Sequence, residues 1–140
     1  MYIGCHTGSC RTTDSLIEGN YIHHLRGTSD GGNDGIEIKV GSFGNIVRDN
    51  VIHDTNIGRR YPGIFVYGGG AGTNVVEGNV IWNAGEGIQV VSDAIVRNNI
   101  IFDCSATGIT AAPHAAVPRV CNATIINNTI HNAPVGVRIR

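Results

Sequence analysis

Short aliphatic segments that end in asparagine recur five times along the chain. The asparagines are spaced by 30, 29, 20 and 29 residues: Asn20, Asn50, Asn79, Asn99 and Asn128. A β-branched residue stands three positions before each asparagine and an isoleucine two positions after it, as in Val47 and Ile52. Apolar residues that alternate over short segments, without a helical period, are typical of β-strands. A repeat of this length built from short strands predicts a β-solenoid.

A further strand in each unit is opened by glycine. These strands begin at Gly35, Gly63, Gly87, Gly108 and Gly136, and an aliphatic residue follows each glycine. The chain has 20 glycines among its 140 residues, which is about twice the usual frequency of about 7%. We expect them where each coil needs several sharp turns.

The pattern x-x-I-x-N-N-x-I followed by G-I-x-I resembles the right-handed parallel β-helix repeat family, the pectin lyase-like superfold. The resemblance covers residues 15–140 and implies three strands in each coil, with carbohydrate bound across the outer face of the glycine-opened strands. We therefore expect one all-β domain over residues 1–140, a right-handed single-stranded parallel β-helix of about five coils. The family also suggests an exported or extracellular protein.

Both ends of the chain align with a glycine-opened strand, so we expect no evident end caps. Open strand edges invite pairing with other chains. Outward aliphatic columns through Ile46 and Val51 add to this expectation. We therefore predict a homo-oligomer or a segment of a longer β-helix.

The asparagines are predicted to form an internal ladder, because identical amides about 4.8 Å apart can hydrogen-bond from coil to coil. Two positions before them lies a column of mostly alternating charge: Glu18, Arg48, Glu77, Arg97 and Ile126. Opposite charges on neighbouring strands predict ion pairs on a solvated face.

Rings and polar groups follow the asparagines at fixed distances. Three positions after them stand His23, His53, Trp82, Phe102 and His131, and four positions after them stand His24, Asp54, Asn83, Asp103 and Asn132. We interpret the first column as a ring stack and the second as a polar turn ladder. The His23, His53, His24 and Asp54 group has a metal-like composition, but we assign no metal and no cofactor.

Composition excludes several classes of partner. A formal net charge of −1 gives no electrostatic case for nucleic acid or for an anionic membrane. The sequence contains no apolar run long enough to span a bilayer, and its first residues lack the basic and apolar regions of a signal peptide. Cys5 and Cys10 are close enough to form a local disulfide or to remain free thiols, and Cys104 and Cys121 fit small buried positions.

The longest connections flank the glycine-opened strands, at 25–34, 55–62 and 111–120. Long loops on a scaffold of short loops often carry function. They predict a groove floored by Glu37, Lys39, Phe65 and Tyr67 and edged by Arg59, Arg60, Tyr61 and His114. Aromatic rings suit sugar stacking, and cations suit uronate carboxylates, so the predicted partner is a polysaccharide or oligosaccharide.

A lyase reaction needs a base and a cation that holds the enolate. We assign Lys39 as the base, Tyr67 as acid or base, and Arg59 as the clamp. The substrate-binding residues are then Glu37, Phe65, Arg60, Tyr61, Gln89 and His114. Lyases of the alginate and chondroitin kind have a similar E-I strand, but this chain has one Glu and places Tyr67 where a catalytic Arg is expected.

Two alternatives remain open. A β-helix glycosidase needs two or three close carboxylates. The predicted groove strands have no aspartate, although Asp30 and Asp34 lie on a connecting loop. The other alternative is a non-catalytic structural or adhesive β-solenoid that self-associates.

Overall fold

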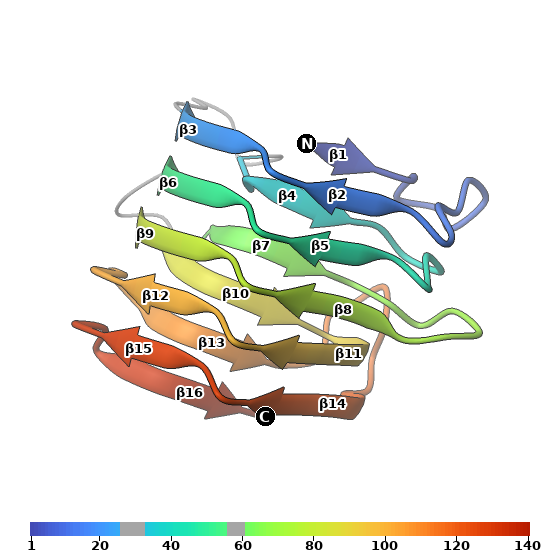
Figure 1. Cartoon of the computed structure of the whole chain (residues 1–140). Helices are drawn as coiled ribbons and strands as arrows, with labels where there is room; N and C mark the ends of the chain where they lie inside the picture. The colour runs from blue at the N-terminus through green and yellow to red at the C-terminus, as the bar shows by residue number, and fades with distance from the viewer. Residues whose placement is uncertain (26–32, 56–60) are drawn as a thin grey trace.

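The computed structural model describes residues 1–25, 33–55 and 61–140, which form a coil of three strands wound repeatedly about one axis (Figure 1). Sheet 1 contains β1 (Tyr2–Ile3), β4 (Ile36–Ile38), β7 (Pro62–Val66), β10 (Glu86–Val90), β13 (Thr107–Ala111) and β16 (Val135–Ile139). Sheet 2 contains β2 (Leu16–Glu18), β5 (Ile46–Arg48), β8 (Asn74–Glu77), β11 (Ser92–Arg97) and β14 (Cys121–Ile126). Sheet 3 contains β3 (Tyr21–Leu25), β6 (Val51–Thr55), β9 (Val80–Ala84), β12 (Ile100–Phe102) and β15 (Thr129–His131).

Every strand pairs in parallel with the equivalent strand of the neighbouring coil, in unbroken register. Val47 lies opposite Val76, for example, and Ile52 lies opposite Ile81. This arrangement confirms the predicted all-β parallel β-helix of about five coils. Within the three described ranges, no helix is long and apolar enough to cross a membrane.

The core consists of stacked aliphatic columns between the three sheets. The fully buried members include Ile36, Ile64, Ile88, Val47, Val76, Val96, Ile52, Ile81 and Ile101. The columns three positions before and two positions after the asparagines therefore face inward. In the predicted outward columns, Leu16 and Tyr21 of the first coil are exposed, and Ile46 and Val51 are half-buried. Burial of each branched side chain contributes about 1.5–3 kcal/mol to stability.

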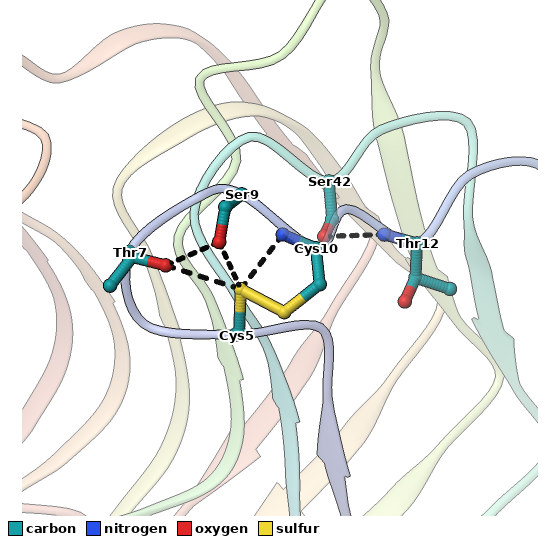
Figure 2. The surroundings of a disulfide bond; sticks show 6 residues. All are labelled: Cys5, Thr7, Ser9, Cys10, Thr12 and Ser42. Carbon is teal, nitrogen blue, oxygen red and sulfur yellow. Dashed lines mark hydrogen bonds between the residues drawn. A yellow bond between two sulfur atoms is a disulfide. The ribbon is translucent and has the colours of Figure 1, made fainter.

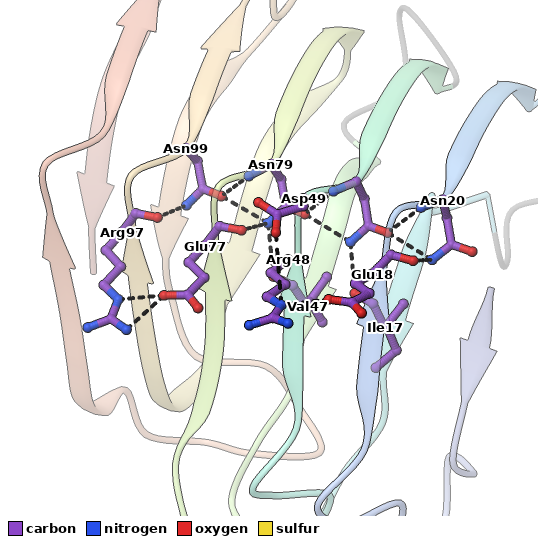
Figure 3. Close-up of polar contacts among 11 residues, drawn as sticks. Ile17, Glu18, Asn20, Val47, Arg48, Asp49, Glu77, Asn79, Arg97 and Asn99 are labelled. Atoms are coloured by element: carbon purple, nitrogen blue, oxygen red, sulfur yellow. Dashed lines mark hydrogen bonds and ion pairs between the residues drawn. The ribbon is translucent and has the colours of Figure 1, made fainter.

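The asparagine ladder runs along the turn between sheets 2 and 3, as predicted (Figure 3). Nδ2 of Asn79 donates to Oδ1 of Asn99 at 2.9 Å and to the carbonyl of Val47 at 3.0 Å. Oδ1 of Asn79 accepts from Nδ2 of Asn50 at 2.9 Å. Each amide therefore joins two coils and satisfies backbone groups of the turn, which makes these residues structural.

The predicted ion pairs form on the solvated side of the same turn (Figure 3). Arg48 Nε lies 2.7 Å from Glu18 Oε2, and Arg97 Nη2 lies 2.7 Å from Glu77 Oε2. All four side chains are partly exposed, so screening limits their contribution to stability.

A second, shorter asparagine ladder lies at the turn that enters sheet 2. Nδ2 of Asn45 donates to Oδ1 of Asn74 at 3.0 Å, and Oδ1 of Asn45 accepts the backbone N–H of Ser15 at 3.2 Å. Sequence reasoning missed it, because only two coils carry the amide and the next two have alanine, at Ala94 and Ala123. The available signal was that Asn45 and Asn74 each stand five residues before a main-ladder asparagine.

Four of the five glycines that open the strands of sheet 1 serve close packing rather than sharp turns, which corrects the expectation for Gly35, Gly63, Gly87 and Gly108. A Cβ atom on Gly87 would lie 2.5 Å from the carbonyl oxygen of Gly108 and 2.5 Å from Cγ2 of Ile101. A Cβ atom on Gly35 would lie 2.5 Å from the carbonyl oxygen of Gly63. At these four positions, the neighbouring coil and the isoleucine column of sheet 3 therefore leave no room for a side chain, whereas Gly136 has open space around it.

The ring column on sheet 3 is stacked from His23 to Phe102, as predicted for these residues. The ring centroids of His23 and His53 are 5.3 Å apart, those of His53 and Trp82 are 4.2 Å apart, and those of Trp82 and Phe102 are 5.5 Å apart. The interplanar angles are 11°, 10° and 4°. The coil spacing thus fixes the orientation of His53, which is itself buried.

Candidate functional site

The predicted groove residues come together on the outer face of sheet 1, in the first coils. Glu37 on β4 lies opposite Phe65 on β7, and Phe65 lies opposite Gln89 on β10. Lys39 and Tyr67 follow the ends of β4 and β7. Outward-facing positions recur at every second residue of a strand. The column that contains Glu37 and Phe65 therefore lies beside the column that contains Lys39 and Tyr67.

This surface is more enclosed than the open groove expected from the sequence. The exposed fractions of Glu37, Lys39, Phe65 and Tyr67 are only 5%, 3%, 7% and 4%. Two residues of one connection pack against these side chains: His114 contacts the rings of Phe65 and Tyr67, and Val117 packs against their apolar cluster. Covering these rings removes apolar surface from water, which favours the closed arrangement.

A charged pair lies within this enclosed surface. Lys39 Nζ forms an ion pair with Glu37 Oε1 and donates to Nδ1 of His6 at 3.3 Å. The same ammonium lies 4.1 Å from the ring centroid of Tyr2 and 5.0 Å from that of Tyr67. We call these residues and His114 the Lys39 cluster: Tyr2, His6, Glu37, Lys39, Tyr67 and His114.

A disulfide closes the loop that carries His6 (Figure 2). Cys5 and Cys10 are bonded, which resolves the choice between a local disulfide and free thiols, whereas Cys104 is a buried free thiol. The backbone N–H of Cys10 donates to Sγ of Cys5 at 2.8 Å, and the hydroxyl of Ser42 accepts from the N–H of Thr12 at 3.1 Å. The first contact lies within the loop, and the second ties the end of the loop to Ser42 of the next coil, whose backbone N–H donates to the carbonyl of Lys39.

Burial changes the acid–base properties of two members of the cluster. Burial, then the nearby charge of Glu37, raises the pKa of the Tyr67 phenol well above its usual value. Burial, then the nearby His6 and Lys39, lowers the pKa of His114. At neutral pH, the cluster therefore presents a neutral phenol, which can donate a proton, beside a neutral imidazole, which can accept one.

Asp34 is a further buried carboxyl group next to the cluster. Burial, then the Glu37 carboxylate, raises the pKa of Asp34 to about 7, against the opposing effect of Lys39. Among the described residues, Oδ1 of Asp34 has no hydrogen-bond partner. A perturbed carboxyl beside charged partners is typical of functional sites.

Because the pKa of Asp34 is raised in the folded state, we expect the stability of the protein to fall as the pH rises from about 4 to about 7. In this pH range Asp34 keeps its proton in the folded protein, whereas in the unfolded chain its carboxyl group, with a pKa of about 3.9, has lost it. Asp34→Asn removes this contribution, because the amide does not titrate. Urea unfolding at about pH 5 and about pH 8 should show a smaller difference in the variant than in the native protein; an equal difference would contradict the prediction.

The remaining predicted site residues lie apart from the cluster or outside the described residues. Tyr61 precedes β7, at the opposite end of the strand from Tyr67, and Gln89 is half-buried one coil beyond Phe65. Arg59 and Arg60 fall outside the described residues. Sequence reasoning missed Tyr2, since only the pairing of β1 with β4 brings it opposite Glu37.

A second group of polar side chains lies where sheet 3 turns toward sheet 1. His24, His53 and Asp54 converge there, beside the ring stack. The hydrogen bonds from His53 and Asn83 lower the pKa of Asp54. The turn ladder predicted at this position is confirmed, since Nδ2 of Asn83 donates to Oδ1 of Asp54 and Nδ2 of Asn132 donates to Oδ1 of Asp103.

Comparison with known proteins identifies the family of the chain. The family described as the right-handed beta helix region matches residues 4–140, so the chain belongs to this family. The predicted right-handed winding is thereby confirmed. No curated protein and no solved structure matches the chain.

Proposed function

We propose that this right-handed β-helix domain binds an acidic polysaccharide or oligosaccharide at the Lys39 cluster. The observation that supports the proposal is a buried ion pair, Glu37 with Lys39, surrounded by tyrosine and histidine rings on the outer face of sheet 1. A buried ion pair is costly to desolvate and is weak evidence for a purely stabilising role.

The exposed members of the cluster supply the binding surface. Tyr2 is 56% exposed, His6 is exposed and His114 is partly exposed. A sugar ring can stack on Tyr2, while the two imidazoles hydrogen-bond to its hydroxyl or carboxylate oxygens. A uronate carboxylate reaches the Lys39 ammonium, which lies 4.1 Å from the Tyr2 ring, only by displacing Glu37 from the ion pair.

Lyase-like chemistry is the finer proposal for the same surface. Lys39 is held in an ion pair, so its ammonium suits the stabilisation of a developing enolate better than proton abstraction. The neutral His114 imidazole, whose ring centroid lies 4.8 Å from that of Tyr67, suits the base, and the Tyr67 phenol suits the acid. Arg59, the predicted clamp, lies outside the described residues.

Binding and cleavage can be tested with a panel of acidic and neutral polysaccharides. We expect calorimetry to show saturable binding of a polyuronate, which Tyr2→Ala and His114→Ala each weaken about tenfold, or 1.4 kcal/mol. His131→Ala is the matched control, because His131 is an exposed histidine on sheet 3. Formation of unsaturated sugar ends, lost in Tyr67→Phe, would support the lyase reaction.

Two outcomes would contradict the proposal. One is the absence of saturable binding to any glycan, and the other is binding that Tyr2→Ala and His114→Ala leave unchanged. Either result would favour the alternative, a non-catalytic structural or adhesive module. Sedimentation of the purified protein over a range of concentrations would then test the self-association proposed for such a module.

A further inference from the structure

The turn from sheet 3 to sheet 1 places two imidazoles and one carboxylate close together in the first two coils. His24 Nε2 lies 3.4 Å from Asp54 Oδ2, and His53 Nδ1 lies 2.9 Å from the same oxygen. One ligand atom from each residue falls within 4.8 Å of the others. We propose that His24, His53 and Asp54 bind a divalent transition-metal ion such as Zn²⁺, at a site distinct from the Lys39 cluster.

The donor set and its spacing suit this class of ion. Imidazole nitrogen and carboxylate oxygen bind zinc at about 2.0–2.2 Å, so two ligands of one tetrahedral ion are about 3.3 Å apart. The 3.4 Å between His24 Nε2 and Asp54 Oδ2 matches this value, whereas His53 Nδ1 and Asp54 Oδ2, at 2.9 Å, are at hydrogen-bond distance and must exchange that proton for the ion and separate by about 0.4 Å. Two nitrogens and one oxygen favour zinc-type ions over Ca²⁺ or Mg²⁺, which prefer oxygen ligands. Three protein ligands leave a fourth position for water.

Each of the three ligands has an outer partner that orients it. His53 Nε2 lies 2.9 Å from the hydroxyl of Tyr21. Asp54 Oδ1 accepts from the amide of Asn83, which leaves Oδ2 directed at the histidines. His24 Nδ1 lies 2.7 Å from His23 Nδ1. Such outer partners fix the tautomer and the ring orientation of metal ligands, and metal affinity depends on them.

The repeating scaffold supports the site and also offers a matched comparison. His53 is stacked between His23 and Trp82, so its ring is held in place before any ion binds. Asp103 occupies the position of Asp54 two coils further on, but its neighbour in the ring column is Phe102, which offers no ligand atom. The same turn with and without imidazoles therefore exists within one protein.

The experiment is a zinc titration of protein first freed of metal with a chelator. We expect calorimetry to show saturable binding of one ion per chain. His24→Ala, which removes an exposed side chain, and Asp54→Asn should each weaken binding about tenfold or more. Asp103→Asn and His131→Ala should leave the affinity unchanged. Circular dichroism and thermal melting of each variant establish that it is folded.

A second probe reports the ligands directly. Co²⁺ in place of Zn²⁺ should give the visible absorption of a tetrahedral nitrogen and oxygen site, and His24→Ala should change this spectrum. The proposal is overturned if zinc does not saturate near one ion per chain, or if His24→Ala and Asp54→Asn bind as tightly as the native protein. Loss of binding in the double variant His6→Ala and His114→Ala would also overturn it, because those residues belong to the Lys39 cluster.

Discussion

Gly87→Ala is expected to destabilise the protein by about 3 kcal/mol, because the site has no space for a methyl group. The added carbon would lie 2.5 Å from the carbonyl oxygen of Gly108 and 2.5 Å from Cγ2 of Ile101. The first of these atoms is backbone and the second belongs to the fully buried core, so neither can move without displacing a neighbouring coil. Urea unfolding measures the change.

Gly136→Ala is the matched control, since Gly136 opens a strand at the equivalent position of β16. A Cβ atom there would meet no heavy atom within 4 Å. Alanine also restricts the unfolded chain more than glycine does, which stabilises the folded state by about 0.4–1 kcal/mol where the conformation is compatible. We therefore expect Gly136→Ala to be neutral or slightly stabilising. Equal losses in the two variants would refute the steric explanation of the glycine column.

Asn79→Ala is expected to destabilise the protein by about 2 kcal/mol, because it interrupts the ladder at its middle rung. Asn79 is fully buried. Its amide donates to the carbonyl of Val47 at 3.0 Å, and its Oδ1 accepts the backbone N–H of Asn50 at 3.1 Å. Alanine would leave these backbone groups in the core without their partner, at a cost of about 1–3 kcal/mol.

Asn20→Ala is the comparison for the ladder, since Asn20 is only partly buried and has a neighbouring rung on one side. Its Nδ2 donates to Oδ1 of Asn50 at 2.8 Å and to the carbonyl of Glu18 at 3.1 Å. Water can replace these contacts at a partly exposed turn. We expect the melting temperature to fall much less in Asn20→Ala than in Asn79→Ala. Equal melting temperatures in Asn79→Ala and the native protein would argue against the ladder.

The two proposed sites also differ in how they relate to the repeat. The Lys39 cluster depends on loops, since the disulfide-closed loop brings His6 to Lys39 and the 112–120 connection brings His114 to Tyr67. The His24, His53 and Asp54 site depends on the coil itself, since its residues occupy fixed positions of consecutive repeats. The first site should therefore tolerate little change in its loops, whereas the second should depend mainly on coil register.

The repeat was sufficient to predict the architecture, because each column of equivalent residues indicates the same coil of short parallel strands. The β-branched residues before each asparagine and the isoleucines after it specify which side chains are buried, and Val47, Ile52, Val76 and Ile81 are fully buried as expected. The spacing of the repeat also specifies the register, so that the ring stack through His53 and the ion pair between Arg97 and Glu77 could be predicted. Contacts between equivalent positions of neighbouring coils follow directly from a periodic pattern.

The sequence did not predict how the segments outside the repeat pack, and only the tertiary structure shows it. The sequence placed Lys39 and Tyr67 on an exposed groove floor, whereas the loops with His6 and His114 enclose them. The reason for glycine at Gly87 also lay in another coil, at a backbone carbonyl that no sequence spacing reveals. A repeat fixes contacts between equivalent residues, but loops of unequal length and composition make contacts that depend on their three-dimensional path.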